Sequence, residues 1–182
     1  KKMTEKALRQ LCEGSHIDLA GKQDESAKEN IFADPDACDL NELVNQILTM
    51  QTEYSWSAEA ECLEDHGLMD AEYVLDIGAG NGQFLCRLAK RHPDKEFIGV
   101  EISEPLVERA LKTSRDMNLT NIAFIHDECP TSSVKGKFDF VLARLAIYCA
   151  PNRDDVLEWA YDKLEEDGRI VVSELDYDWI YT

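Results

Sequence analysis

One short segment constrains this chain more than any other feature: an apolar run that ends in an acid and is followed by three closely spaced glycines. Residues 74–84 read Val-Leu-Asp-Ile-Gly-Ala-Gly-Asn-Gly-Gln-Phe, which predicts a buried strand, a sharp turn and a helix beginning near Gln83. Gly78, Gly80 and Gly82 lack a Cβ atom, so the chain can turn and a ligand can touch the main chain. The free N–H groups and partial positive charge of the helix start add to this site.

The spacing of the glycines and the position of Asp76 favour an adenosine ligand without phosphate groups. The usual dinucleotide fingerprint is G-x-G-x-x-G, whereas this chain has G-x-G-x-G. A carboxylate beside the turn repels a pyrophosphate and attracts an amino group. S-adenosylmethionine has an ammonium for Asp76 and a carboxylate for the N–H groups of the turn. Glu101 ends the next apolar run, where it can accept hydrogen bonds from both ribose hydroxyls.

These segments resemble the class I (Rossmann-like) S-adenosylmethionine-dependent methyltransferases. The resemblance covers about residues 71–175, and the segments follow the order of that family. They are similar to its first motif (74–82), its second strand with the ribose-binding acid (96–103), the end of its third strand (124–128), its fourth strand (138–144) and the turn into its fifth (167–172). The resemblance implies a methyltransferase enzyme with S-adenosylmethionine as its cofactor.

The resemblance also implies a set of cofactor-binding residues, with an acid after the third strand meeting the adenine amino group. The set comprises Asp76, Gly78, Gly80, Gly82, Glu101, Ile102, Asp127, Glu128 and Arg144. Two members of the set have alternative interpretations. Asp127 could instead be a solvated loop acid, and Arg144 could bind a substrate carboxylate or pair with a nearby acid. Because Ser103 is the expected helix N-cap, Glu101 is free for a ligand. No catalytic base is predicted.

Strand and helix patterns alternate after residue 71, which predicts an α/β chain with a parallel sheet. Together with the resemblance this gives a three-layer Rossmann-like methyltransferase fold with an N-terminal helical extension. The expected elements are strands at 72–77, 96–101, 122–126, 138–143 and 169–175, and helices at 83–91, 104–117 and 153–166. The chain ends soon after the fifth strand, so we expect it to lack the final antiparallel hairpin of that fold.

Three segments are predicted along the chain. Residues 1–37 are polar and expected to be flexible or partly helical, 38–70 form a helical extension over the cofactor, and 71–182 form a C-terminally truncated core. In the extension, one helix is expected from Asp39 as its cap and a second over Ser57–His66, ended by Gly67. Tyr54 and Trp56 either close over the methionine end of the cofactor or serve as packing anchors.

Charge and composition bound the partners. The formal net charge of −18 repels phosphate backbones and so argues against a nucleic-acid substrate, although an acidic surface also serves solubility alone. A small-molecule substrate is the expected partner. The sequence has no apolar run of about twenty residues, so no membrane span is expected. Its six cysteines and four histidines form no metal-ligand spacing, which favours a cytoplasmic protein with reduced thiols and no metal site.

The resulting functional hypothesis is transfer of a methyl group to an unidentified, small-molecule acceptor by direct displacement, which needs alignment more than acid–base chemistry. Two alternatives are an NAD(P)-binding oxidoreductase and a non-catalytic methyltransferase-like partner subunit. The exposed edge of the fifth strand is expected to allow self-association.

Overall fold

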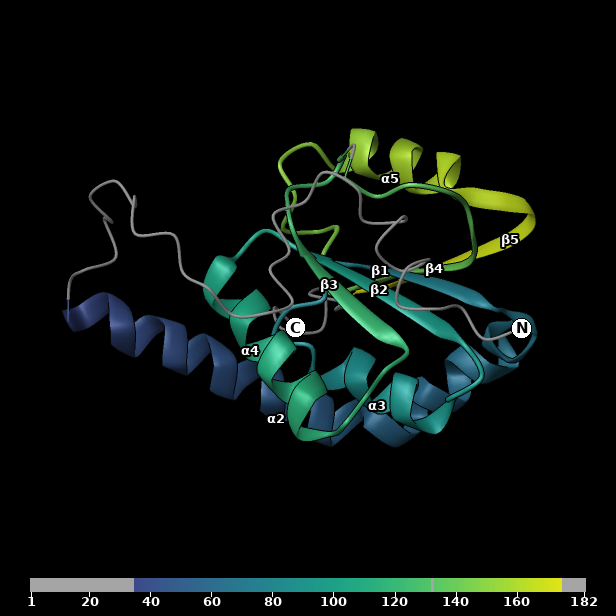
Figure 1. Cartoon of the computed structure of the whole chain (residues 1–182). Helices are drawn as coiled ribbons and strands as arrows, with labels where there is room; N and C mark the ends of the chain where they lie inside the picture. Colours follow the sequence, from purple (N-terminus) through teal and green to yellow (C-terminus); the bar gives the residue numbers. More distant parts are fainter. Residues whose placement is uncertain (1–34, 132, 175–182) are drawn as a thin grey trace, which may run out of the picture.

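A computed structural model describes residues 35–131 and 133–174 of the chain. Within them, a single five-stranded sheet has the order β3-β2-β1-β4-β5, and every neighbouring pair of strands is parallel (Figure 1). The strands are β1 (Tyr73–Ile77), β2 (Glu96–Glu101), β3 (Ile122–His126), β4 (Phe138–Arg144) and β5 (Leu164–Ser173). The predicted parallel sheet is confirmed. The chain was expected to lack the final antiparallel hairpin of this fold, and all strand pairs of the described sheet are parallel. Residues 1–34 and 175–182 lie outside the described residues.

Helices cover both faces of this sheet and make the three expected layers. The helices are α2 (Pro35–Asp65), the short 3-10 helix η1 (Leu68–Asp70), α3 (Gln83–Arg91), α4 (Glu104–Asp116) and α5 (Arg153–Asp162). Figure 1 shows α5 on one face and α2, α3 and α4 on the other. Because both faces are covered, the strand residues are apolar almost without interruption. Val74 belongs to the core cluster on the face covered by α3 and α4, and Leu75 belongs to the cluster on the face covered by α5.

The N-terminal extension differs from its prediction, because α2 is one continuous helix of 31 residues and not two. Asp39 therefore lies inside the helix instead of capping it. Residues 49–56 are polar enough to suggest a break, but they contain no glycine or proline. Their hydroxyls are satisfied within the helix, since Thr49 Oγ1 donates to the Asn45 carbonyl at 2.9 Å and Ser55 Oγ to the Gln51 carbonyl at 2.8 Å.

The α5–β5 connection also differs from its prediction. The helix ends at Asp162 instead of 166, and β5 begins at Leu164. Phe138 pairs with Leu164 while Phe140 pairs with Arg169, so the acidic residues 165–167, expected at the end of the helix and in the turn after it, form a bulge in the strand. The bulge lies close to β4, since a Cβ atom at Gly168 would be 3.0 Å from the Phe138 carbonyl oxygen.

The strand order fixes where a ligand can bind. The chain runs from β1 outward to β2 and β3, and then returns to β4 on the other side of β1. The carboxyl ends of β1 and β4 therefore flank a topological switch point, which is the usual ligand crevice of open parallel sheets. The glycine turn follows β1, and Arg144 is the last residue of β4.

Candidate cofactor site

The glycine turn folds back across the end of β2. The N–H groups of Gly78 and Ala79 both donate to the Val100 carbonyl, at 2.8 and 3.0 Å. Gly78, Gly80 and Gly82 have φ angles of 74°, 57° and 72°, a left-handed region that residues with a Cβ atom rarely adopt. The predicted sharp turn from strand into helix is thus formed.

Close neighbours of the glycines are parts of the protein itself. A Cβ atom at Gly82 would lie 2.8 Å from the Ala110 Cα atom, and one at Gly78 would lie 2.5 Å from the Ala146 Cβ atom. At Gly80 it would lie 3.2 Å from Leu48 of α2. The glycines therefore allow close packing of α4, α2 and the segment after β4 against the turn. The sequence analysis had explained the missing Cβ atoms by the approach of a ligand alone.

The N–H groups of the three glycines are already used inside the protein. Gly82 donates to the Ala79 carbonyl at 3.1 Å, and Gly80 donates to Glu101 Oε2 at 2.9 Å, while Gly78 bonds to Val100. The sequence analysis expected these groups to hold the cofactor carboxylate, and each of them has an acceptor inside the protein in this structure. What the turn offers a ligand is close approach to its main chain.

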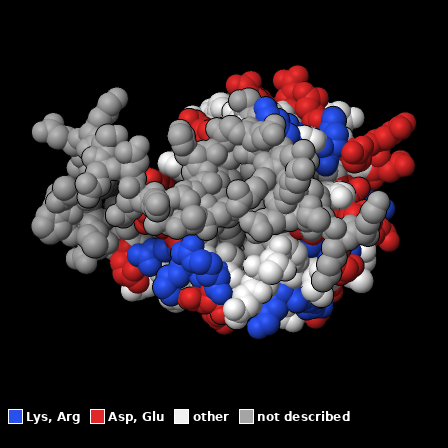
Figure 2. Space-filling model, in the orientation of Figure 1, with Lys and Arg blue, Asp and Glu red and all other residues white. Residues whose placement is uncertain are grey.

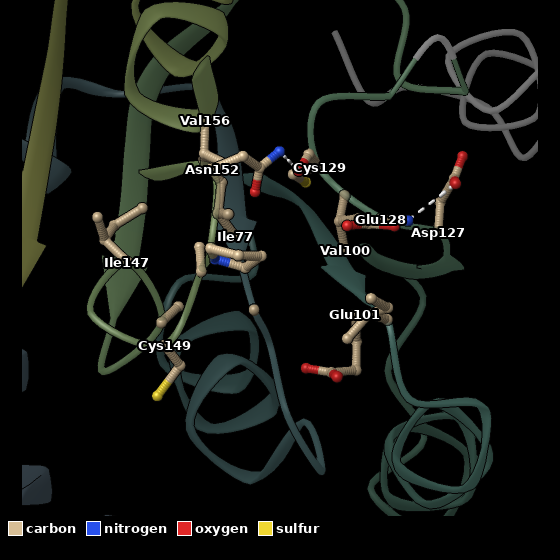
Figure 3. Close-up of a pocket in the computed structure, with 15 residues that line it drawn as sticks. Ile77, Val100, Glu101, Asp127, Glu128, Cys129, Ile147, Cys149, Asn152 and Val156 are labelled. Carbon is tan, nitrogen blue, oxygen red and sulfur yellow. Dashed lines mark hydrogen bonds between the residues drawn. The ribbon is translucent and has the colours of Figure 1, made fainter. Parts of the chain in front are cut away.

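Glu101 joins the two loops that the sequence analysis connected through a ligand. Its side chain is buried, and Oε1 accepts a 2.9 Å hydrogen bond from the Ser103 N–H group while Oε2 binds Gly80. Each carboxylate oxygen has a second lone pair available for a ligand hydroxyl. Figure 3 shows the carboxylate directed toward the side of the cleft where Cys149 lies.

Asp76 is the most unusual polar group in the described part of the chain. It is only 3% exposed, and its Oδ1 atom has no hydrogen-bond partner among the described residues. Burial raises the pKa of Asp76 to about 8, the Arg144 charge opposes this rise, and Glu101 adds to it. A buried, unpartnered carboxyl oxygen is costly unless a donor or a cation reaches it.

A cleft with two lobes runs past Glu101 and the glycine turn, and Asp76 lines neither lobe. The glycine-turn lobe, of about 270 Å³, lies between α2, the glycine turn and the segment after β4. The β3 lobe, of about 180 Å³, lies between the ends of β1, β2 and β3 and the segment before α5 (Figure 3). Residues common to both lobes are Gly78, Glu101, Ile102, Ala146 and Cys149. A ligand with two different ends and a hydroxyl-bearing middle near Glu101 matches this shape.

In the β3 lobe, Asp127 is engaged with its own loop. Its carboxylate accepts hydrogen bonds from the Glu128 N–H group at 2.8 Å and from the hydroxyls of Thr131 and Ser133. The hydroxyl of Ser133, then that of Thr131, lowers the pKa of Asp127. Glu128 and Ile102 also line this lobe, and both are exposed. Contact of these residues with adenine stays a prediction.

In the glycine-turn lobe, Arg144 is paired with an acid. Its guanidinium binds Glu59 and donates to Ser55 Oγ at 3.1 Å, both on α2, and it lies 4.7 Å from the centre of the Phe84 ring. The pairing alternative of the sequence analysis is therefore the one formed here. A role of Arg144 toward the cofactor stays a prediction.

Sequence reasoning missed several residues of this lobe. Asn81 and Thr52 are buried in it, and Leu145 has a φ angle of 55°, which is rare for a bulky residue. No pattern in the sequence indicates the conformation of Leu145. Of the aromatic pair, Tyr54 is 96% exposed, whereas Trp56 packs edge-on against Phe84 with ring centres 5.5 Å apart. Trp56 is thus a packing anchor.

The described residues contain no cluster of His, Cys, Asp and Glu side chains with metal-binding geometry. None of the helices in this part of the chain has the length and apolar character needed to span a bilayer.

The fold and the site together define a class of protein. Its members have an open parallel sheet and a ligand cleft with two lobes at the switch point. One acid lies near the end of β1 and another at the end of β2. Residues 68–180 match a family described as "Methyltransferase domain". The chain belongs to this family and is a class I S-adenosylmethionine-dependent methyltransferase domain. This confirms the predicted methyltransferase class and cofactor, and the family match gives no support to the oxidoreductase alternative.

Relatives and solved structures agree with this assignment. A tRNA (guanine-N(7)-)-methyltransferase of Synechococcus sp. (strain JA-3-3Ab) is 51% identical over 51 residues, which cover 28% of this chain and 22% of that protein. A carboxy-S-adenosyl-L-methionine synthase of Nautilia profundicola is 28% identical over 108 residues, 59% of this chain and 46% of that protein. The chain thus spans less than half of either relative.

Among solved structures, the plantazolicin methyltransferase BpumL in complex with SAH has the same fold. It superposes with a TM-score of 0.67 at 24% identity, over 82% of this chain and 57% of that chain. Likeness at this level of identity is evidence for the fold alone.

Proposed function

We propose that S-adenosylmethionine binds across both lobes of the cleft and that its methyl group is transferred to a small-molecule acceptor. One observation carries the proposal: Asp76, whose buried Oδ1 has no partner among the described residues, is the penultimate residue of β1, two residues before the glycine turn. A ligand ammonium would supply the missing partner and a compensating charge. The cofactor, when bound, supplies a methyl group already activated by its positive sulfur.

The remaining residues divide between the two ends of the cofactor. In this proposal Gly78, Gly80 and Gly82 let its methionine part approach the main chain, and Arg144 is the cation nearest to its carboxylate. Glu101 accepts from the ribose hydroxyls with its free lone pairs.

On the adenine side, we propose contacts with Ile102, Asp127 and Glu128, which line the β3 lobe. The exposed apolar side chain of Ile102 suits the face of a base, and the two acids suit an exocyclic amino group.

The acceptor is proposed to be a small molecule and not RNA. Lys and Arg side chains occur over α3 and α4, while acidic side chains gather around α5 and β5 (Figure 2). Several of the basic groups are neutralised by carboxylates: Arg87 by Glu53, Arg91 by Glu64, Arg109 by Glu42 and Lys112 by Asp116. Paired cations on an acidic chain hold phosphates poorly.

Two minor parts of the proposal concern setting and assembly. Four cysteines are free, namely Cys62, Cys86, Cys129 and Cys149, which supports a reducing, cytoplasmic environment. Self-association through the outer edge of β5 is also proposed, because β5 pairs with β4 on one side and Val172 on it is 43% exposed. Sedimentation velocity of Val172→Lys tests this contact. If the chain forms dimers and this variant does not reduce them, the dimer contact does not involve the edge of β5.

Calorimetric titration with S-adenosylhomocysteine tests the cofactor site. We expect micromolar binding to the unmodified chain and at least tenfold weaker binding to Asp76→Asn and Glu101→Gln. Glu165→Gln is the matched control, because it removes an exposed carboxylate at the bulge of β5 without touching the cleft. Absence of heat with a folded sample, or equal binding by all variants, would overturn the proposed site.

A second titration separates the cofactor classes. NADH fluorescence is expected to stay unchanged on addition of the chain, since the G-x-G-x-G turn before α3 departs from the G-x-G-x-x-G fingerprint of dinucleotide sites. A saturable increase that S-adenosylhomocysteine displaces would mean that the cleft takes adenosine ligands without discrimination.

A further inference from the structure

The helix α2 is attached to the glycine turn through the side-chain amide of Asn81. Asn81 is buried, and its Nδ2 group donates to Asn45 Oδ1 at 3.0 Å and to Thr49 Oγ1 at 3.1 Å. The other end of the same amide, Oδ1, accepts a hydrogen bond from the Gln83 N–H group at 3.2 Å. One side chain therefore caps the first turn of α3 and binds α2.

This attachment places α2 directly over the turn. Asn45 and Thr49 are one helical turn apart, and Leu48 between them is the side chain nearest to Gly80. Val44, Leu48 and Thr52 form the α2 wall of the glycine-turn lobe. If α2 lifted, this lobe would lose a wall, and the buried amide of Asn81 would lose its acceptors in α2.

A second attachment lies further along α2, where Glu59 and Ser55 bind Arg144. The helix thus contacts both sides of the switch point, the turn after β1 and the last residue of β4. The Arg144 attachment involves a residue already assigned to the cofactor, whereas Asn45 and Thr49 do not line either lobe.

We propose that Asn81 is a positioning residue that couples the docking of α2 to cofactor binding. The coupling rests on the proposed placement of S-adenosylmethionine in the glycine-turn lobe. A cofactor in the lobe stabilises docked α2 by completing its contacts, and docked α2 retains the cofactor by the same free energy. Loss of the Asn81 bonds lowers cofactor affinity even when every residue that lines the lobe is unchanged.

Variants on α2 test the coupling without altering the cleft. Asn45→Ala combined with Thr49→Val removes the two side-chain acceptors of the Asn81 amide and leaves the cap of α3 intact. Only the longer, 3.3 Å hydrogen bond from Asn81 to the Asn45 carbonyl remains in α2. Asn81→Asp is the reciprocal change: it keeps the cap acceptor at Gln83 but places a carboxylate oxygen opposite Asn45 Oδ1. The control is Gln46→Ala together with Met50→Ala, two exposed positions of the same helix.

Two measurements are made on each variant, hydrogen exchange of the α2 segment 41–53 without ligand and the Kd for S-adenosylhomocysteine. We expect at least tenfold faster exchange in this segment and at least tenfold weaker binding for the α2 double variant and for Asn81→Asp. Exchange in β1 and α3 should stay unchanged, and the control should match the unmodified chain. In the unmodified chain, ligand should slow exchange of 41–53.

The outcomes separate the two proposals. If S-adenosylhomocysteine does not bind the unmodified chain, the proposed cofactor site fails, while the exchange data still report whether Asn81 docks α2. If exchange accelerates but Kd is unchanged, the coupling is wrong. If neither changes in the α2 double variant, Asn81 does not position α2. Should Asn81→Asp not fold, the α2 double variant decides.

Discussion

At the residue scale, Asp76 is a buried carboxyl group with an unpartnered oxygen, and a cationic ligand would give that oxygen a partner. Its pKa is raised from 3.8 to about 8, so the free protein holds this carboxyl largely protonated at neutral pH. A bound ammonium favours the ionised form. Ligand binding is therefore expected to expel a proton.

The first prediction is that affinity for S-adenosylhomocysteine rises with pH from 6 toward 8, up to about tenfold per unit. Calorimetry in buffers with different ionisation enthalpies should show about one proton released per site at pH 6.5. Asp76→Asn should bind weakly without this release. A pH-independent Kd in the unmodified chain would contradict the assignment of the ammonium to Asp76.

The same group predicts a stability effect of opposite sign. Because the folded pKa lies above the unfolded pKa, the folded chain binds more protons, and the contribution of Asp76 to stability decreases as pH rises from about 4 to 8. We expect Asp76→Asn without ligand to unfold at a higher urea concentration than the unmodified chain at pH 8. The difference should become smaller at pH 5, and a lower midpoint for the variant at pH 8 would contradict the buried, unpartnered state.

The glycines give a graded prediction at the same scale. A Cβ atom at Gly82 would meet the backbone of α4 at 2.8 Å, whereas one at Gly80 would meet the flexible Leu48 side chain at 3.2 Å. Both replacements also force alanine into a left-handed conformation, which costs about 1–2 kcal/mol. Gly82→Ala should therefore destabilise the chain more than Gly80→Ala in urea unfolding. The reverse order would mean that α4 shifts more easily than α2.

At the element scale, α2 is held by its C-terminal half as well as by Asn81. Trp56 packs edge-on against Phe84, and the Arg87 guanidinium lies 5.7 Å from the centre of the Trp56 ring. Ala60 and Leu63 of α2 are also buried in the core on this side of the sheet. The helix is thus part of the folded domain and not only a cover over the cleft.

Trp56→Ala should lower the free energy of unfolding by roughly 3 kcal/mol through lost packing. Tyr54→Ala is the matched control in the same helix, since its ring is exposed and its removal should change stability by less than about 0.5 kcal/mol. Urea denaturation followed by circular dichroism measures both. If Tyr54→Ala instead weakened S-adenosylhomocysteine binding, that ring would close over the cofactor, as one interpretation of the sequence held.

At the scale of the whole molecule, the net charge of −18 opposes contact with polyanions and also strains the fold by self-repulsion. Salt screens charges over about 8 Å at 0.15 M, so the melting temperature should rise between 10 and 150 mM NaCl. In a mobility-shift assay at 50 mM salt, tRNA should not bind to the chain more tightly than about 10⁻⁴ M. Tight, salt-sensitive binding would contradict the small-molecule proposal.

Much of this architecture follows from local sequence. The bounds of α3, β2 and β3 agree with the periodicity, because a strand buried on both faces and an amphipathic helix each leave a pattern within a few residues. The continuity of α2 was not predictable in this way, since its polar middle is satisfied by hydroxyl bonds back to the helix. The bulge of β5 likewise depends on pairing with β4, which no local pattern encodes.

The sequence by itself determined the class of ligand and the parallel sheet, because the glycine turn, the acid near the end of each of two strands and the alternation of strand and helix patterns are all local features of the sequence. The order of the strands in the sheet came from the structure. Only the tertiary structure decided what those residues touch. It showed Glu101 bound to Gly80 and Ser103, Arg144 paired with Glu59, and Asn81 joined to α2. Such contacts join segments distant in sequence, and their geometry is set only when the layers of the fold pack together.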